Sequence, residues 1–178
     1  MSDIFFQRRN DPTNVVRAET QITTEGSETC PTVFLREAEI YMVYQSGTGI
    51  AVRHTQNIFP LTDTINWSSK TMAITNASMP FIALDEANKW LHLSYWNSST
   101  IYSARSNDNG STYFNGNGTA VTQGSQGTVI ASSVTAEQQA SIVVDELSGN
   151  LLCTYEDNSG TIQVMRSRDF GASWQAIT

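Results

Sequence analysis

The sequence predicts an all-β protein built from about three copies of one four-stranded antiparallel meander. A segment starting at Phe81, FIALDEANKWLHLSYWNSSTIYSARSNDNGSTYF, aligns with one starting at Ser141, SIVVDELSGNLLCTYEDNSGTIQVMRSRDFGASW. A weaker third copy begins near Val33. The copies recur at a spacing of about 50 to 60 residues, which is typical of arrays of one supersecondary unit. Their apolar residues alternate or form short β-branched and aromatic blocks, which indicates strands and not helices.

Each copy contains three predicted strands, separated by turn residues such as Gly, Asn and Ser. The first strand is expected at 33–35, 81–84 and 141–144, the second at 40–44, 90–96 and 151–155, and the third at 49–54, 100–105 and 161–166. A fourth strand is expected after each third strand, at 71–75, 119–123 and 174–178. A segment of the same type, 15–23, precedes the first copy.

Two copies carry the same loop motif directly after the third strand. An Asp followed two residues later by Gly suits a hairpin, because the carboxylate can accept backbone N–H groups while Gly takes positive φ. The aromatic that ends the motif can cover the loop. The first copy departs from the pattern, with Asn57 in place of the Asp. The motif residues, predicted to be structural, are Ser106, Asp108, Gly110, Thr112 and Tyr113 in one copy and Ser167, Asp169, Gly171, Ser173 and Trp174 in the other.

This motif resembles the Asp-box, S/T-x-D-x-G-x-T/S-W/F/Y, of the sialidase-like Asp-box (BNR) repeat β-propeller family. The resemblance covers residues 30–178. It implies antiparallel four-stranded blades of β-propeller type, about three per chain, with the Asp-boxes as folding elements distant from any catalytic centre. The expected organisation is an N-terminal arm at 1–14, which either docks or is a disordered tail, and an Asp-box propeller-like domain at 15–178.

The sequence supplies few of the groups that the resemblance to sialidases would require. Sialidases of this architecture use an arginine triad, a tyrosine nucleophile and an acid/base Asp. Their Arg-Ile-Pro motif is absent, since the prolines that precede a first strand follow Cys30 and Met79. Arg53, Arg105 and Arg166 recur once per copy, so we expect them to occupy equal structural positions and not to form a triad. No catalytic residue is predicted, and enzymatic activity is not favoured.

The sequence predicts no metal or cofactor site. The pairs Asp85-Glu86 and Asp145-Glu146 fall where first and second strands must turn, so turn chemistry explains them better than a hard cation does. His54 and His92 lie in different copies and match no zinc spacing. Cys30 and Cys153 occupy unrelated positions and are expected to be free thiols.

Charge and hydropathy exclude two classes of partner. A net charge of -7 argues against nucleic acid, because phosphate binding needs clustered Lys and Arg. The apolar run Ile4–Phe6 is too short for a signal peptide or a membrane span. We therefore expect a soluble protein without a signal peptide or membrane contact, synthesised in the cytoplasm.

Three blades are fewer than the four to eight that usually close a propeller, so two apolar sheet faces would lack cover. This predicts self-association, or docking on a host protein. The favoured function is a non-enzymatic binding or structural module, with glycan binding or decoration of a phage or virus particle as the candidate role. The alternative is a sialidase-like glycoside hydrolase, or a fragment of one completed by another subunit. The candidate sugar-stacking residues are Trp90, Trp96 and Tyr102, for which packing inside a blade is the other interpretation.

Overall fold

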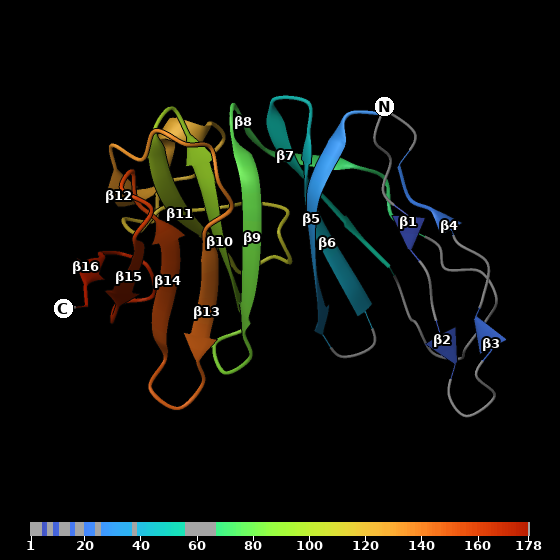
Figure 1. Cartoon of the computed structure of the whole chain (residues 1–178). Coiled ribbons are helices and arrows are strands. Elements are labelled where there is room, and N and C mark those ends of the chain that lie inside the picture. The colour runs from blue at the N-terminus through green and yellow to red at the C-terminus, as the bar shows by residue number, and fades with distance from the viewer. Residues whose placement is uncertain are drawn as a thin grey trace.

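The described residues form three four-stranded antiparallel sheets and short N-terminal strand pairs (Figure 1). The structure, a computed structural model, describes residues 5–6, 9–10, 15–16, 20–23, 26–36, 39–55 and 67–177. Each sheet is a meander in which strands adjacent in sequence are paired. The predicted all-β fold with about three blades of β-propeller type is therefore confirmed. No described segment forms a helix long and apolar enough to cross a membrane.

The strands of each sheet follow one another along the chain. The first sheet contains β5 (Glu28–Arg36), β6 (Glu39–Ser46), β7 (Gly49–His54) and β8 (Thr71–Thr75). The second contains β9 (Ser78–Asp85), β10 (Trp90–Asn97), β11 (Thr100–Ser106) and β12 (Thr128–Ser132), with the short 3-10 helix η1 (Gly124–Gln126) before β12. The third contains β13 (Ser141–Asp145), β14 (Asn150–Glu156), β15 (Ile162–Ser167) and β16 (Gln175–Ala176).

The fourth strand of the second sheet was predicted in the wrong place. β12 at 128–132 pairs with β11, whereas the segment predicted as that strand, 119–123, makes only isolated bridges from Ala120 to Phe114 and from Gln123 to Thr75. Val121 is buried, and its N–H donates to the carbonyl oxygen of Tyr113 at 2.8 Å. The segment is thus an extended loop folded back on the preceding hairpin, and an extended loop with one buried face has the same alternating pattern as a strand.

The N-terminal strands pair with one another and not with a blade. β1 (Phe5–Phe6) pairs with β4 (Thr20–Gln21), and β2 (Arg9–Asn10) pairs with β3 (Val15–Val16). The segment 15–23, which resembles the fourth strands in sequence, therefore contributes β3 and β4 to these separate pairs. Most of the predicted arm at 1–14 lies outside the described residues.

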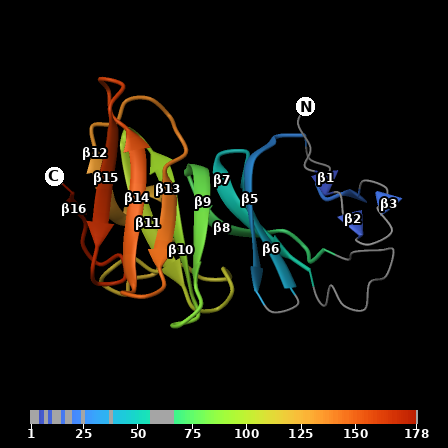
Figure 2. The same cartoon turned by 60° about the horizontal axis from the view of Figure 1, so that its bottom comes forward.

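The first strands of successive sheets lie next to one another. β9 contacts β5 on one side and β13 on the other, and the sheets fan out from this row of strands (Figures 1 and 2). One core cluster, which includes Val43, Ile50 and Leu93, fills the space between the first and second sheets. A second cluster, which includes Ile101 and Cys153, lies between the second and third sheets. This is the packing of propeller blades.

The two outer sheet faces differ from each other. On the outer face of the first sheet, Met42 and Tyr44 are buried in a cluster with Ile22. Val33 pairs with Met42 and shares this face, but it is 58% exposed, so the face is covered only in part. On the third sheet, Val143 and Ile162 alternate with residues that face the second sheet, and they are 49% and 65% exposed. Among the described residues, both outer faces therefore expose apolar side chains. Self-association or docking on a host protein stays a prediction.

Candidate functional site

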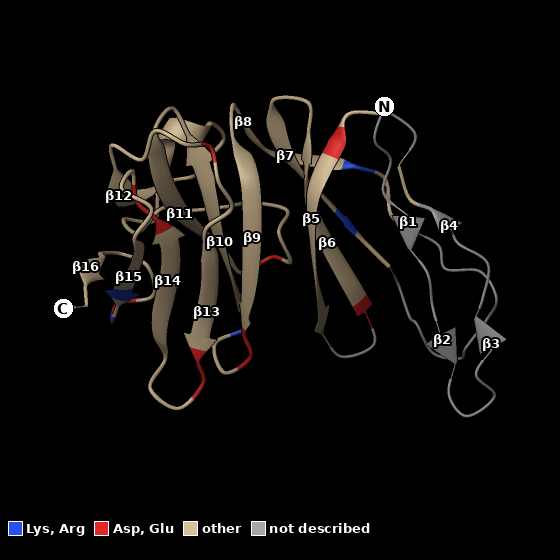
Figure 3. Cartoon of the chain, in the orientation of Figure 1, with Lys and Arg blue, Asp and Glu red and all other residues tan. Residues whose placement is uncertain are grey.

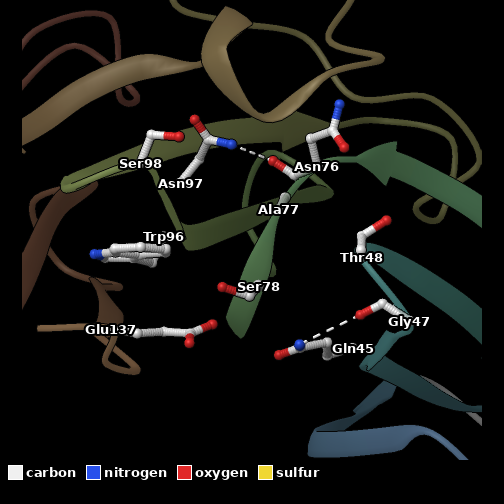
Figure 4. A pocket seen from close by; sticks show the side chains of 10 residues that line it. All are labelled: Gln45, Gly47, Thr48, Asn76, Ala77, Ser78, Trp96, Asn97, Ser98 and Glu137. Carbon is white, nitrogen blue, oxygen red and sulfur yellow. Dashed lines mark hydrogen bonds between the residues drawn. The ribbon is translucent and has the colours of Figure 1, made fainter.

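A pocket of about 240 Å³ lies where turns of the first and second sheets meet the segment that leads to β13 (Figure 4). It is formed at the ends of β6 and β10 and at the start of β9. The loop motifs that follow β11 and β15 lie at the other end of the sheets, because each third strand starts at one end and finishes at the other. The lining residues are Gln45, Gly47, Thr48, Asn76, Ala77, Ser78, Trp96, Asn97, Ser98 and Glu137.

Hydrogen bonds between neighbouring loops hold the rim of the pocket in place. The N–H of Ala77 donates to the carbonyl oxygen of Thr48 at 3.0 Å, which ties the β8–β9 connection to the β6–β7 turn. The Asn97 side-chain amide donates to the carbonyl oxygen of Asn76, as Figure 4 shows. Ser98 and Ser99 both have positive φ, as a two-residue type I′ hairpin turn requires. The rim is therefore ordered before a ligand enters.

Two residues with strained backbone lie beside the pocket. Met79, which follows Ser78 of the lining, has φ 53, and Cys30 has φ 51. Both precede a proline, and the Cys30 thiol donates to the Met79 thioether sulfur at 3.2 Å. The Gln45 side chain accepts the Met79 N–H at 3.2 Å. Non-glycine residues in this region cost about 1 to 3 kcal/mol each, and such strain clusters at functional sites.

Trp96 is the one predicted stacking residue that lines the pocket. Its indole N–H donates to the carbonyl oxygen of Val134 at 3.2 Å, which fixes the ring as a wall of the pocket (Figure 4). The Trp90 ring is instead covered by the Arg105 guanidinium, whose carbon lies 4.7 Å from the ring centroid. Tyr102 stacks on Tyr95 with the ring centroids 5.7 Å apart. Trp90 and Tyr102 therefore pack within the fold.

Glu137 is the single ionisable side chain among the described residues of the lining. It lies in the connection between β12 and β13, and Figure 4 shows its carboxylate beneath the Trp96 ring, turned towards the interior of the pocket. Sequence reasoning did not single out this residue. The lining comes from turns and connections at sheet ends, where no periodic pattern marks a functional residue.

The two loop motifs have the same hydrogen bonds. The Ser106 hydroxyl donates to the Asp108 carboxylate at 2.7 Å and accepts the Gly110 N–H at 2.9 Å, and the corresponding distances around Ser167 are 2.7 Å and 2.8 Å. The Asp108 carboxylate also accepts the Thr112 N–H at 2.8 Å. Gly110 and Gly171 have φ 82 and 83.

Each Asp of the motif is stabilised in its charged form. Burial opposes ionisation of Asp108, but hydrogen bonds from Thr112 and Ser106 outweigh it and lower the pKa of this carboxyl. At Asp169, burial also raises the pKa, and hydrogen bonds from Ser173 and Ser167 lower it by more. The carboxylates thus bind their own loops.

Replacing Ser106 with alanine should lower the free energy of unfolding by about 1 to 2 kcal/mol, because the buried Gly110 N–H loses its acceptor. Urea unfolding measures this loss, and Ser167→Ala should behave in the same way. Ser111 is an exposed serine of the same loop, so Ser111→Ala serves as the control and should change little. Equal losses for Ser106→Ala and Ser111→Ala would contradict the structural role of the motif.

The recurrent arginines bind local groups. Arg53 donates to the Tyr44 hydroxyl at 3.1 Å and to the carbonyl oxygen of Ser68 at 3.3 Å. Arg105 donates to the carbonyl oxygen of Phe170 at 3.2 Å and covers Trp90. These contacts hold parts of the fold together. Arg53 belongs to the first sheet and Arg105 to the second, so the two arginines lie in different blades.

The paired carboxylates lie in turns, as Figure 3 shows for the connections from β9 to β10 and from β13 to β14. Asp85 accepts the backbone N–H of Asn88 at 2.9 Å and its side-chain amide at 2.8 Å. Asp145 accepts the Leu147 N–H at 3.1 Å and the Ser148 hydroxyl. In the described part of the chain, no group of three or more His, Cys, Asp or Glu residues could hold a metal ion.

Comparisons with known proteins bear on the fold. No family model matches the sequence, and a comparison with curated proteins finds no match, so the Asp-box family assignment stays a prediction. An endo-1,5-α-L-arabinanase from Thermotoga petrophila RKU-1 matches 77% of this chain with a TM-score of 0.55 and 16% identity. A GH43 glycoside hydrolase engineered to display endo-xylanase and exo-arabinofuranosidase activity matches 90% with a TM-score of 0.52 and 14% identity.

A third solved structure, the Hadza microbial sialidase Hz136, matches 86% of the chain with a TM-score of 0.42 and 14% identity. This chain covers 38% of the arabinanase, 34% of the GH43 enzyme and 47% of the sialidase. It therefore spans between a third and a half of the length of these structures. The first two likenesses agree with the assignment of the sheets as propeller blades.

Proposed function

We propose that this chain is a non-enzymatic carbohydrate-binding module of β-propeller type, and that the pocket beside Trp96 is its sugar site. The observation that carries the proposal is the composition of the lining, in which one aromatic wall faces hydroxyl and amide groups. A sugar ring presents C–H groups on its faces and hydroxyl groups around its edge. The indole can pack on the C–H groups, while Asn, Gln, Ser and Thr side chains bind the hydroxyl groups.

The size and the order of the pocket support the same role. Its volume of about 240 Å³ is below the range of about 300 to 1,000 Å³ that holds drug-sized ligands, so it suits one sugar ring or the end of a chain. The hydrogen bonds of Ala77 and Asn97 hold the rim without a ligand. A rim held in this way reduces the entropy that binding must overcome.

The carboxylate content favours binding over hydrolysis. Most glycoside hydrolases use two carboxyl groups, about 5 to 10 Å apart, on either side of the scissile bond. The described lining contains only Glu137. The second candidate function is a glycoside hydrolase whose remaining site residues come from other blades. It is favoured by the names of the arabinanase and the GH43 enzyme, of which this chain spans 38% and 34%.

Replacing Trp96 with alanine should weaken binding of a glycan found on an array by at least about tenfold, or 1.4 kcal/mol, because the stacking wall is lost. Isothermal titration calorimetry measures the affinity. Trp90→Ala is the matched control, since this indole lies under Arg105 at the far end of β10 and its loss should leave the affinity unchanged.

Two outcomes would oppose the proposal. If Trp96→Ala binds the glycan as tightly as the wild type, the pocket is not the site. Turnover of the glycan that disappears in Glu137→Gln would favour the hydrolase candidate. The predicted setting on a phage or virus particle is untested and stays a prediction.

A further inference from the structure

The charge of the pocket lining points to the class of sugar that it takes. Resting on the proposed function, we infer that the pocket binds amine-bearing sugars more tightly than neutral ones and neutral ones more tightly than acidic ones, with Glu137 as the residue that discriminates between them. A glycan that ends in an acid group, such as a sialic acid or a uronic acid, is therefore the weakest of the three classes of ligand.

The lining has negative charge without a compensating cation. Of its ten described residues, Glu137 ionises and the others carry no charge. No hydrogen bond or ion pair to its carboxylate occurs within the described ranges. The side chain is exposed, and Figure 4 places its oxygens towards the pocket. A ligand ammonium group could therefore approach the carboxylate without displacing a protein partner.

The recurrent arginines cannot supply a cation to the pocket. The pocket lies at the starts of β7 and β11, next to Thr48 and Ser98, whereas Arg53 and Arg105 lie near the ends of these strands. With about 3.3 Å per residue, this places Arg105 about 17 Å along β11 from Thr100, at the pocket end. A carboxylate held in the pocket would be well beyond hydrogen-bond reach of its guanidinium.

Lys70 is directed to the opposite side of the first sheet. Its ammonium donates to the Ser46 hydroxyl at 3.4 Å. Ser46 follows Gln45 in β6, and successive side chains of a strand point to opposite faces. Since Gln45 lines the pocket, the Ser46 side chain and its lysine partner belong to the other face. Among the described residues, an acidic sugar would therefore meet Glu137 without a counter-charge.

The experiment compares sugars that share ring stereochemistry and differ in charge. The probes are the methyl glycosides of glucose, glucosamine and glucuronic acid, and the same three derivatives of the galactose series, at a pH where the amines are protonated. Affinities are measured for the wild type and Glu137→Gln, at low salt and in about 1 M NaCl, where the Debye length is about 3 Å. Glu146→Gln is the control, because it removes one negative charge from an exposed turn at the other end of the sheets.

Exposed charge pairs contribute modestly, so the amine should bind the wild type about two- to fivefold more tightly than the neutral sugar at low salt. The acid should bind more weakly than the neutral sugar. Glu137→Gln and high salt should both bring the three affinities together, and Glu146→Gln should keep the wild-type order.

Three results would overturn the inference. The first is that acidic sugars bind the wild type as tightly as amine-bearing sugars do. The second is that Glu137→Gln keeps the wild-type order of affinities for the amine-bearing, neutral and acidic sugars. An equal change in Glu146→Gln would mean that net charge, and not the pocket, sets the order. These results leave the proposed sugar site intact, whereas a failure of all six probes to bind would count against the proposed function itself and end the inference with it.

Discussion

Lowering the pH from 6.5 to 4 should reduce the free energy of unfolding by about 3 kcal/mol through His92 alone. This histidine is 1% exposed and lies in β10, on the face that the second sheet turns to the third. Its Nε2 atom has no hydrogen-bond partner among the described residues. A charged imidazolium would therefore be buried without adequate compensation.

Burial lowers the pKa of His92 from its ordinary value of 6.5 to about 4. The Asp85 carboxylate, whose Oδ2 atom lies 3.9 Å from Nε2, opposes this shift, and the Arg105 guanidinium adds to it. Below pH 6.5 the unfolded chain takes up a proton that the folded protein does not bind until about pH 4. Stability from this group is therefore complete above pH 6.5 and is lost progressively as the pH falls to 4.

Urea unfolding of the wild type and of His92→Gln at several pH values between 7 and 4 measures this effect. Carboxylates also titrate near the lower limit, but they are common to both proteins. The decline of stability with falling pH should be smaller in the variant by about 3 kcal/mol over this range. Parallel pH profiles for the two proteins would show that His92 is not the group responsible.

The strands were largely predictable from sequence because each blade repeats the same pattern of apolar blocks and turn residues. Aligning the copies placed the first three strands of every sheet close to their observed positions. The segment 119–123 misled the prediction, since its buried Val121 packs on the hairpin and not in a ladder. The partial cover of the first sheet was also missed, because Ile22 reaches Met42 and Tyr44 only through tertiary packing.

The site was much less predictable than the fold. Aromatic residues could be named as stacking candidates, but their sequence positions did not distinguish Trp96, at the pocket, from Trp90, under Arg105. Glu137 gave no signal because it is one exposed carboxylate in an irregular connection. A pocket assembled from turns of separate sheets exists only once the sheets are packed, so no local pattern encodes it.

The two ends of the sheets differ in how their polar groups are used. At the loop-motif end, Ser106, Asp108 and their counterparts around Ser167 bond to one another, which leaves few groups for a ligand. At the pocket end, the Glu137 carboxylate remains available. This contrast favours the pocket end for binding and assigns the motif end to stability.

Gly116→Ala should destabilise the protein by about 3 kcal/mol, because a methyl group has no room where the loops of the second and third sheets meet. A Cβ atom at Gly116 would lie 2.4 Å from the Cα atom of Ala172 and 2.8 Å from its carbonyl oxygen. These are backbone atoms of the loop motif that follows β15, so a change of side-chain rotamer cannot relieve the clash. The two loops would have to separate.

Gly118→Ala is a control two residues away. Gly118 has φ 79 and no atom within 4 Å of the position that a methyl group would take, so alanine there should cost only the backbone strain, about 1 to 2 kcal/mol. Thermal and urea unfolding should rank Gly116→Ala below Gly118→Ala in stability. Adding Ala172→Gly to Gly116→Ala should restore nothing, because the Cα atom and the carbonyl oxygen remain. A Gly116→Ala protein as stable as the wild type would mean that the second and third sheets are not packed through this contact.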